Sequence, residues 1–164
     1  MNRWLDKLEE GIERAVSFGA VVGGVFTAVM TVIVGYAVVA RYVFNRPIGW
    51  SEEISMYLMV WAAFLGAAYT LKEDGHIGVD VLIVNLKPKT RKLFLVGHYV
   101  VGIALFAVFL HQGIELVALS LKMDNRSMAI EFPIWLPHLA VPVGSALLLL
   151  ECLHKLMNLR SEKG

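Results

Sequence analysis

The chain has 164 residues, of which 57% are hydrophobic and only 18% are charged, and its mean hydropathy is +0.64. Soluble domains are about 45–50% apolar and about 25% charged, so this composition favours a protein that resides in lipid. The length fits one domain, residues 1–164. A formal net charge of +1 offers no basic surface for nucleic acid, and the single cysteine excludes an intrachain disulfide.

Four runs of the sequence are long and apolar enough to cross a bilayer, whose hydrocarbon core of about 30 Å needs about 20 helical residues. They predict spans at residues 16–41, 51–71, 92–117 and 133–156. None of them alternates polar and apolar residues as the strands of a membrane barrel do. The sequence therefore predicts an all-α membrane protein with four transmembrane helices.

Two further segments are expected to lie at the membrane surface. In residues 3–16, apolar side chains recur at helical spacing among charged ones, which is typical of an amphipathic interfacial helix that runs into the first span. Acidic residues in this segment argue against a cleaved signal peptide. Residues 77–86 are apolar but too short to span, and they predict a short surface element between spans two and three.

Lysine and arginine predict the orientation of the chain. The N-terminal segment, the loop between spans two and three and the C-terminal tail hold 11 of these residues, and the other two loops hold four. Positive residues accumulate on the cytoplasmic side of membrane proteins. We therefore expect both termini in the cytoplasm and the other two loops on the outer side.

Small residues spaced four apart occur in three spans, where they allow helix backbones to approach closely. They serve either packing within the chain or docking of another membrane protein, and the sequence leaves both open. Pro142 removes a backbone hydrogen bond and predicts a kink in span four. The small-residue pairs are Gly19–Gly23, Ala62–Gly66 and Ala140–Gly144.

A polar cluster is expected where the first outer loop joins two spans. Arg41 ends span one, and Trp50, Glu52 and Glu53 open span two nine residues later, so the two helix ends must lie close together. Arginine and carboxylates near a membrane tend to pair. We expect Glu53, which is one residue deeper than Glu52, to be the partner of Arg41. The alternative is that Ser51 and both acids only cap the helix.

No arrangement typical of a catalytic or metal site is visible, and no acid or base is expected in the middle of the membrane, where a coupled carrier would need one. Glu151 is expected near the inner end of span four, paired with Lys155. The histidines keep a haem-bearing membrane anchor open as an alternative, because His98 and His154 could meet near the inner side. His111 pairs more simply with Glu115, four residues on.

Residues 40–80 read ARYVFNRPIGWSEEISMYLMVWAAFLGAAYTLKEDGHIGVD. This stretch resembles the small membrane subunit, the DctQ family, of tripartite ATP-independent periplasmic (TRAP) transporters. Besides the polar cluster, the resemblance rests on the order and spacing of Trp61, Gly66, Gly75, His76 and Asp80. It covers the whole chain in length and topology, although spans three and four match in hydropathy alone.

The resemblance implies a non-enzymatic subunit of a sodium-coupled symporter for a carboxylate solute, an organic acid, in the bacterial inner membrane. It implies two protein partners: a large elevator-type membrane subunit, which holds the solute and sodium sites, and a periplasmic substrate-binding protein. The small subunit would be a scaffold without a cofactor. Polar residues of the outer loops would help to dock the binding protein, and the candidates are Asn45, Arg46, Lys122, Asp124, Asn125 and Arg126.

Overall fold

The computed structural model describes residues 3–73 and 88–161, and their regular elements are helices. Four long helices form: α1 (Arg3–Tyr42), α2 (Gly49–Lys72), α4 (Pro88–Lys122) and α6 (Ala140–Ser161), with the single turn α5 (Trp135–His138) just before α6. All four contain stretches long and apolar enough to cross a membrane. The all-α, four-span prediction is therefore confirmed.

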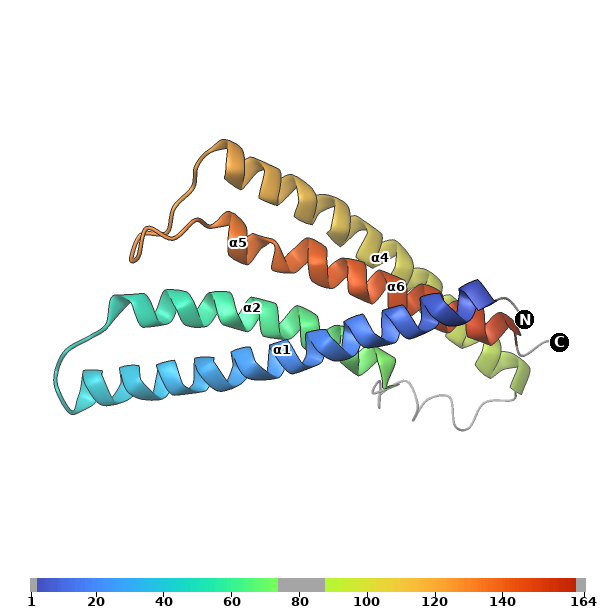
Figure 1. Ribbon diagram of the computed structural model, residues 1–164, viewed down its shortest axis with the longest axis horizontal. Helices are drawn as coiled ribbons and strands as arrows, with labels where there is room; N and C mark the ends of the chain where they lie inside the picture. The colour runs from blue at the N-terminus through green and yellow to red at the C-terminus, as the bar shows by residue number, and fades with distance from the viewer. Residues whose placement is uncertain (1–2, 74–87, 162–164) are drawn as a thin grey trace.

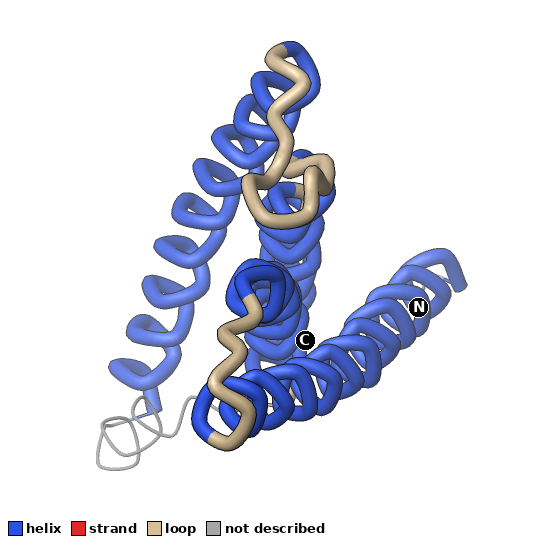
Figure 2. Tube along the Cα trace, turned by 90° about the vertical axis from the view of Figure 1, so that its left-hand side faces the viewer, coloured by secondary structure: helices blue, strands red, loops and turns tan. Residues whose placement is uncertain are grey.

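The helices lie in a row in the order α1, α2, α6, α4, as Figures 1 and 2 show together. α1 packs mainly on α2, and α4 packs mainly on α6, while the contact between α2 and α6 joins the two pairs. The pairs converge at the end that holds both termini and diverge toward the loop after α1 and the loop after α4 (Figure 1). Both outer helices of the row therefore keep one long side uncovered.

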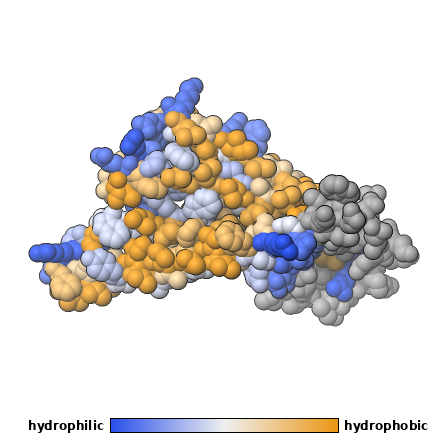
Figure 3. Space-filling model, viewed as in Figure 1, coloured by the Kyte–Doolittle hydropathy of each residue, from blue (hydrophilic) through white to orange (hydrophobic). Residues whose placement is uncertain are grey.

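The hydrophobic core lies at the converging end of the row. It consists of Val16, Ala68, Leu71, Tyr99, Leu148 and Cys152, all at most 8% exposed. Ile12 and Leu156 pack against it, so the first turns of α1 and the end of α6 contribute to the same cluster. Apolar residues also dominate the face shown in Figure 3, and hydrophilic ones gather toward its ends, as a membrane-spanning chain requires.

α1 is one helix of 40 residues, which corresponds to a length of about 60 Å, or twice the hydrocarbon core of a bilayer. The predicted amphipathic segment 3–16 is helical as expected and continues into the first span without a break. Val16 is fully buried and Ile12 packs on the core, so part of its apolar stripe contacts the protein's own helices. The predicted surface element at residues 77–86 lies outside the described residues.

Two sets of small residues explain the close helix contacts. A Cβ atom added at Gly19 would lie 3.3 Å from Leu65 Cδ2, and one added at Gly23 would lie 3.4 Å from Leu65 Cβ. At Gly144 an added Cβ would overlap the Cβ of Phe64 and lie 2.7 Å from its Cδ1. These glycines therefore serve packing within the chain, whereas Gly66 has nothing within 4 Å of such an atom.

The helix is interrupted close to Pro142, where the sequence predicts a kink. α5 ends at His138 and α6 begins at Ala140, so the helix is interrupted one turn before the proline. This is where proline acts, because it lacks an N–H for the carbonyl four residues earlier and its ring crowds that carbonyl. Gly113 of α4 faces Pro142: a Cβ added there would come within 2.9 Å of the Pro142 nitrogen.

Candidate functional site

An ion pair joins the ends of α1 and α2 at the diverging end of the row. The Arg41 guanidinium donates to Glu52 Oε1 over 2.7 Å, and both side chains are exposed, by 52% and 68%. The expected closeness of the two helix ends is therefore found, but the expected pairing of Arg41 with Glu53 is wrong. Trp50 lies in the same first turn of α2 and is 37% exposed.

Glu53 is engaged elsewhere. Its Oε2 accepts a hydrogen bond of 3.2 Å from the backbone N–H of Ala129, which belongs to the loop between α4 and α5. One turn further along α2, the ring of Tyr57 stacks on the ring of Phe132 with centroids 6.1 Å apart. A carboxylate and an aromatic ring of α2 therefore hold this loop against the helix, which is why Glu53 does not pair with Arg41.

The loop between α4 and α5 is itself tightly folded. Residues 126 and 133 form an isolated antiparallel bridge, and the backbone N–H of Ser127 donates to the carbonyl of Phe132 over 2.9 Å. The Ser127 side chain is buried and accepts from the N–H groups of Phe132 and Ile130. The loop thus forms a small hairpin, residues 123–134, fixed by its own backbone and by α2.

The proposed outer-loop contacts lie on exposed positions. Asp124 and Arg126 form an exposed pair in the hairpin, with Nε and Oδ2 3.5 Å apart. Asn45 holds a left-handed backbone conformation with φ 51° in the other loop, next to Arg46, whose N–H caps α1 by donating to the Ala40 carbonyl. Lys122 and Asn125 are exposed as well. Gly75, His76 and Asp80 lie outside the described residues.

The capping interpretation of Ser51 needs correction. α2 begins at Gly49 and its N-cap residue is Ile48, which makes no side-chain cap. The Ser51 hydroxyl lies inside the first turn and donates to the Ile48 carbonyl over 2.7 Å. It therefore satisfies a loop carbonyl instead of the free N–H groups of the helix end.

A second polar cluster, which the sequence did not reveal, lies at the converging end. The Lys72 ammonium at the end of α2 donates to the Ser17 hydroxyl of α1 over 2.9 Å. The Lys155 ammonium of α6 donates to the Lys72 carbonyl over 2.7 Å, so it caps the C-terminal end of α2. These bonds connect three helices whose residues are 55 and 83 positions apart.

Glu151 belongs to this inner cluster. The sequence predicts that it pairs with Lys155, which is indeed one of its charged neighbours, but its side chain is only 1% exposed and its Oε2 atom has no hydrogen-bond partner. The cations of Lys72 and Lys155 act on it, together with Glu13 and His154. Burial disfavours the charged form of the Glu151 carboxyl group, whereas the two ammonium groups favour it. We call Ser17, Lys72, Glu151 and Lys155 the inner cluster.

Three of the histidines have contacts that the structure describes. His138 Nδ1 lies 2.7 Å from the Ser120 hydroxyl, and His111 lies 3.9 Å from Glu115, as predicted. His98 packs edge-on against the neighbouring ring of Tyr99. Among the described residues, no group of three histidine, cysteine or acidic side chains is placed to hold a metal ion.

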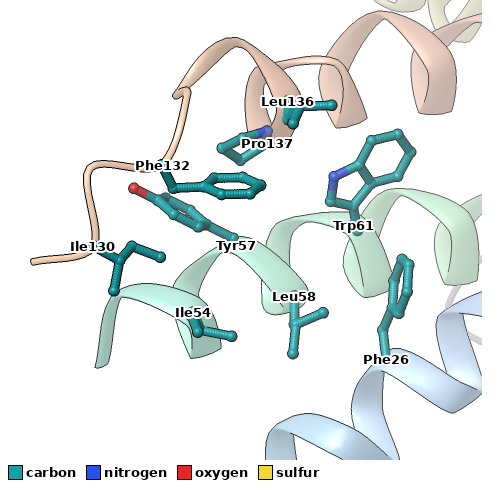
Figure 4. A pocket seen from close by; sticks show the side chains of 9 residues that line it. All are labelled: Phe26, Ile54, Tyr57, Leu58, Trp61, Ile130, Phe132, Leu136 and Pro137. Carbon is teal, nitrogen blue, oxygen red and sulfur yellow. The ribbon is translucent and has the colours of Figure 1, made fainter. Parts of the chain in front are cut away.

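An apolar pocket of about 370 Å³ opens where the two helix pairs diverge. Figure 4 shows its lining: side chains of α2, the hairpin and α5, with Phe26 of α1 beside Trp61 at one end. Phe26 and Trp61 meet edge to face with centroids 6.5 Å apart. The lining residues are Phe26, Ile54, Tyr57, Leu58, Trp61, Ile130, Phe132, Leu136 and Pro137.

The Arg41–Glu52 pair gives a first testable prediction. Because both side chains are exposed, the pair contributes about 0–1 kcal/mol, and Arg41→Ala should change the thermal midpoint of the purified protein only slightly. Arg41→Glu places like charges together and should be worse. Combining it with Glu52→Arg should restore the wild-type midpoint, and combining it with Glu53→Arg should not. Equal rescue by both would contradict the observed pairing.

The row of four apolar helices, with its polar clusters at the two ends, defines a multi-pass membrane protein. Residues 30–162, which make up more than half of the chain, match the sequence family described as tripartite ATP-independent periplasmic transporters, DctQ component. The chain therefore belongs to this family and is a TRAP transporter small permease subunit of the inner membrane. The family resemblance drawn from residues 40–80 is confirmed.

Individual relatives agree with this assignment. The C4-dicarboxylate TRAP transporter small permease protein DctQ of Rhodobacter capsulatus is 33% identical over 60% of this chain and 44% of its own length. The Vibrio cholerae protein of the same name is 38% identical over 42% of this chain and 30% of its own. The isethionate TRAP transporter permease protein DctMQ of Oleidesulfovibrio alaskensis is 25% identical over 65% of this chain. These matches span less than half of each relative. They lend no support to the haem-anchor alternative.

Proposed function

We propose that this chain is the non-transporting, stationary subunit of a sodium-coupled TRAP transporter, on which a large elevator-type membrane subunit moves its solute. The observation that carries the proposal is the row of helices. α1 and α4 each leave one long apolar side uncovered by the chain itself, with side chains such as Phe18, Val32 and Val101 more than 65% exposed. A wide, flat arrangement of this kind offers lateral surface to a neighbour in the membrane.

The chemistry of the described residues supports a passive role. The pocket is lined by apolar and aromatic side chains and by no carboxylate, ammonium or imidazole group. Glu151 lies among the cations of the inner cluster, away from the pocket-lining residues. A coupled carrier needs an ionisable or ion-binding group that faces its transport path. We assign solute and sodium binding to the large subunit.

The relatives' names support the choice of partners. DctMQ is a single permease protein, and the segment similar to this chain makes up 17% of it. A small-subunit sequence can therefore be part of one polypeptide with a much longer permease, which fits a permanent association in the membrane. Other relatives are named for C4-dicarboxylates, isethionate or sialic acid. All of these are organic acids, and we propose that the solute here is one as well.

The orientation gives a second prediction. We propose that both termini lie in the cytoplasm, which is supported by the excess of lysine and arginine in the terminal segments and in the loop after α2. In a variant with Cys152→Ser, single cysteines at the exposed positions Asn45 and Asn125 should react with a membrane-impermeant maleimide added to intact spheroplasts. A cysteine at Glu73 should react only after the membrane is opened. The reverse pattern would overturn the orientation.

Docking of the binding protein gives a third prediction. We propose that the two outer loops receive it, with Arg46, Lys122 and Arg126 steering the encounter, since charges at the rim of an interface affect association more than final affinity. Reversing all three to glutamate should slow uptake several-fold at low binding-protein concentration and leave co-purification with the large subunit unchanged. Reversing Arg14, which pairs with Glu10 far from these loops, is the control. Unchanged uptake across the concentration series would refute this role.

A further inference from the structure

We infer that the apolar pocket between the diverging helix pairs binds one acyl chain of a membrane phospholipid, with the headgroup at the hairpin. The inference depends on the chain being a membrane protein and not on its role in transport. The pocket volume of about 370 Å³ lies in the range of ligand sites. Left unfilled, such a space would cost its lining side chains their dispersion contacts on one side.

The depth of the pocket selects hydrocarbon as the occupant. The α2 residues that line it run from Ile54 to Trp61, which lie about 7 to 18 Å along the helix from its start at Gly49. This interval falls within the half of the bilayer core nearest the hairpin, where acyl chains are the surrounding solvent. The lining is apolar along this interval, so a chain that enters it leaves no polar group unpaired.

The pocket has a polar end and an apolar end, so an amphiphile fits it in one orientation only. At the hairpin end, Figure 4 shows the Tyr57 hydroxyl directed away from the Trp61 end. Ile54 and Ile130 line this end, and their preceding residues, Glu53 and Ala129, form the carboxylate-to-backbone hydrogen bond at its edge. Phe26 and Trp61 close the opposite end with apolar rings. A headgroup ammonium beside Glu53 and a chain directed toward Trp61 match this gradient.

The choice of phospholipid follows from the charge at the edge. Two carboxylates lie at this edge, Glu53 and the exposed Glu131 between Ile130 and Phe132, while Arg126 in the hairpin is paired with Asp124. The two carboxylates attract an ammonium group and repel an anionic headgroup. An aminophospholipid such as phosphatidylethanolamine therefore suits the site better than phosphatidylglycerol. The side chain of a neighbouring protein is the competing occupant, and the experiment below separates the two.

Photolabelling of the full chain in vesicles tests the inference. The vesicles contain phosphatidylethanolamine and phosphatidylglycerol with a trace of phosphatidylethanolamine that carries a diazirine in one acyl chain. After illumination, peptides holding Leu58 and Leu136 should be labelled about tenfold more than the peptide holding Leu105, a preference of about 1.4 kcal/mol. Leu105 is 48% exposed on α4 and reports ordinary lipid contact. Equal labelling would overturn the inference.

Variants make the test specific. Leu58→Trp fills the pocket and should remove the preference, and Ile54→Trp provides a second variant should the first fail to fold. Leu105→Trp, the matched control, should keep it. Glu53→Gln should abolish the advantage of the phosphatidylethanolamine probe over a phosphatidylglycerol probe with the same chain. Labelling that persists in both filled variants, or that disappears when the remaining transporter subunits are present, would assign the pocket to another occupant and overturn the inference.

Discussion

Gly144→Ala should destabilise the subunit by about 3 kcal/mol, the upper end of the usual cost of overpacking. The added methyl group would overlap the Cβ of Phe64, and a Cβ cannot rotate away as the end of a side chain can. The only relief is to move α6 away from α2, and this contact joins the two helix pairs. The expected result is a thermal midpoint many degrees below wild type in the same detergent.

The control for Gly144 is Gly66→Ala, the same chemical change in α2 at a position where an added Cβ meets nothing within 4 Å. It should leave the midpoint within a degree or two of wild type. Phe64→Ala should not rescue Gly144→Ala, because alanine keeps the Cβ atom that causes the overlap. A harmless Gly144→Ala, or full rescue by Phe64→Ala, would show that α2 and α6 do not approach this closely.

Glu151→Met should cost about 2 kcal/mol, because it leaves the ammonium groups of Lys72 and Lys155 without their buried counter-charge. The two lysines are partly exposed, which keeps the cost below that of a fully buried pair. Glu151→Lys should be worse, since it places three cations together. The midpoint of thermal unfolding measures both, and Glu115→Met, at an exposed position of α4, is the control.

A double-mutant cycle tests whether the inner cluster acts as a unit. Lys155→Met removes a cation as well as the cap on the Lys72 carbonyl. If charge compensation dominates, the variant with both Glu151→Met and Lys155→Met should lose less stability than the sum of the single changes. Strict additivity would mean that Glu151 is held by packing alone and that its charge has no stabilising partner.

The features that depend on neighbouring residues were predictable from the sequence. Hydropathy alone located the four spans, because each bilayer crossing is encoded by one continuous segment. The break before α6 followed from Pro142, whose effect acts one turn earlier in the same chain. The family followed from the order of residues between Arg41 and Asp80, all within one stretch.

The features that depend on distant residues were not predictable. The position of Glu53, one residue deeper than Glu52, favoured it as the partner of Arg41. Glu53 instead accepts a hydrogen bond from the backbone N–H of Ala129, which lies 76 residues away in the chain. The inner cluster joins Ser17, Lys72 and Lys155, which no local pattern connects. The apolar pocket likewise combines four separate segments. The small residues Ala140 and Gly144 indicated a close helix contact, but only the fold shows that Phe64 is the residue packed against Gly144.

The most direct test of the stationary role is solute uptake by reconstituted vesicles. Three preparations are compared under a sodium gradient with the binding protein present: this chain alone, the large subunit alone, and both together. We predict no uptake by this chain alone and full uptake by the two together. Sodium-dependent accumulation of the solute by vesicles that contain this chain without the large subunit would contradict the account.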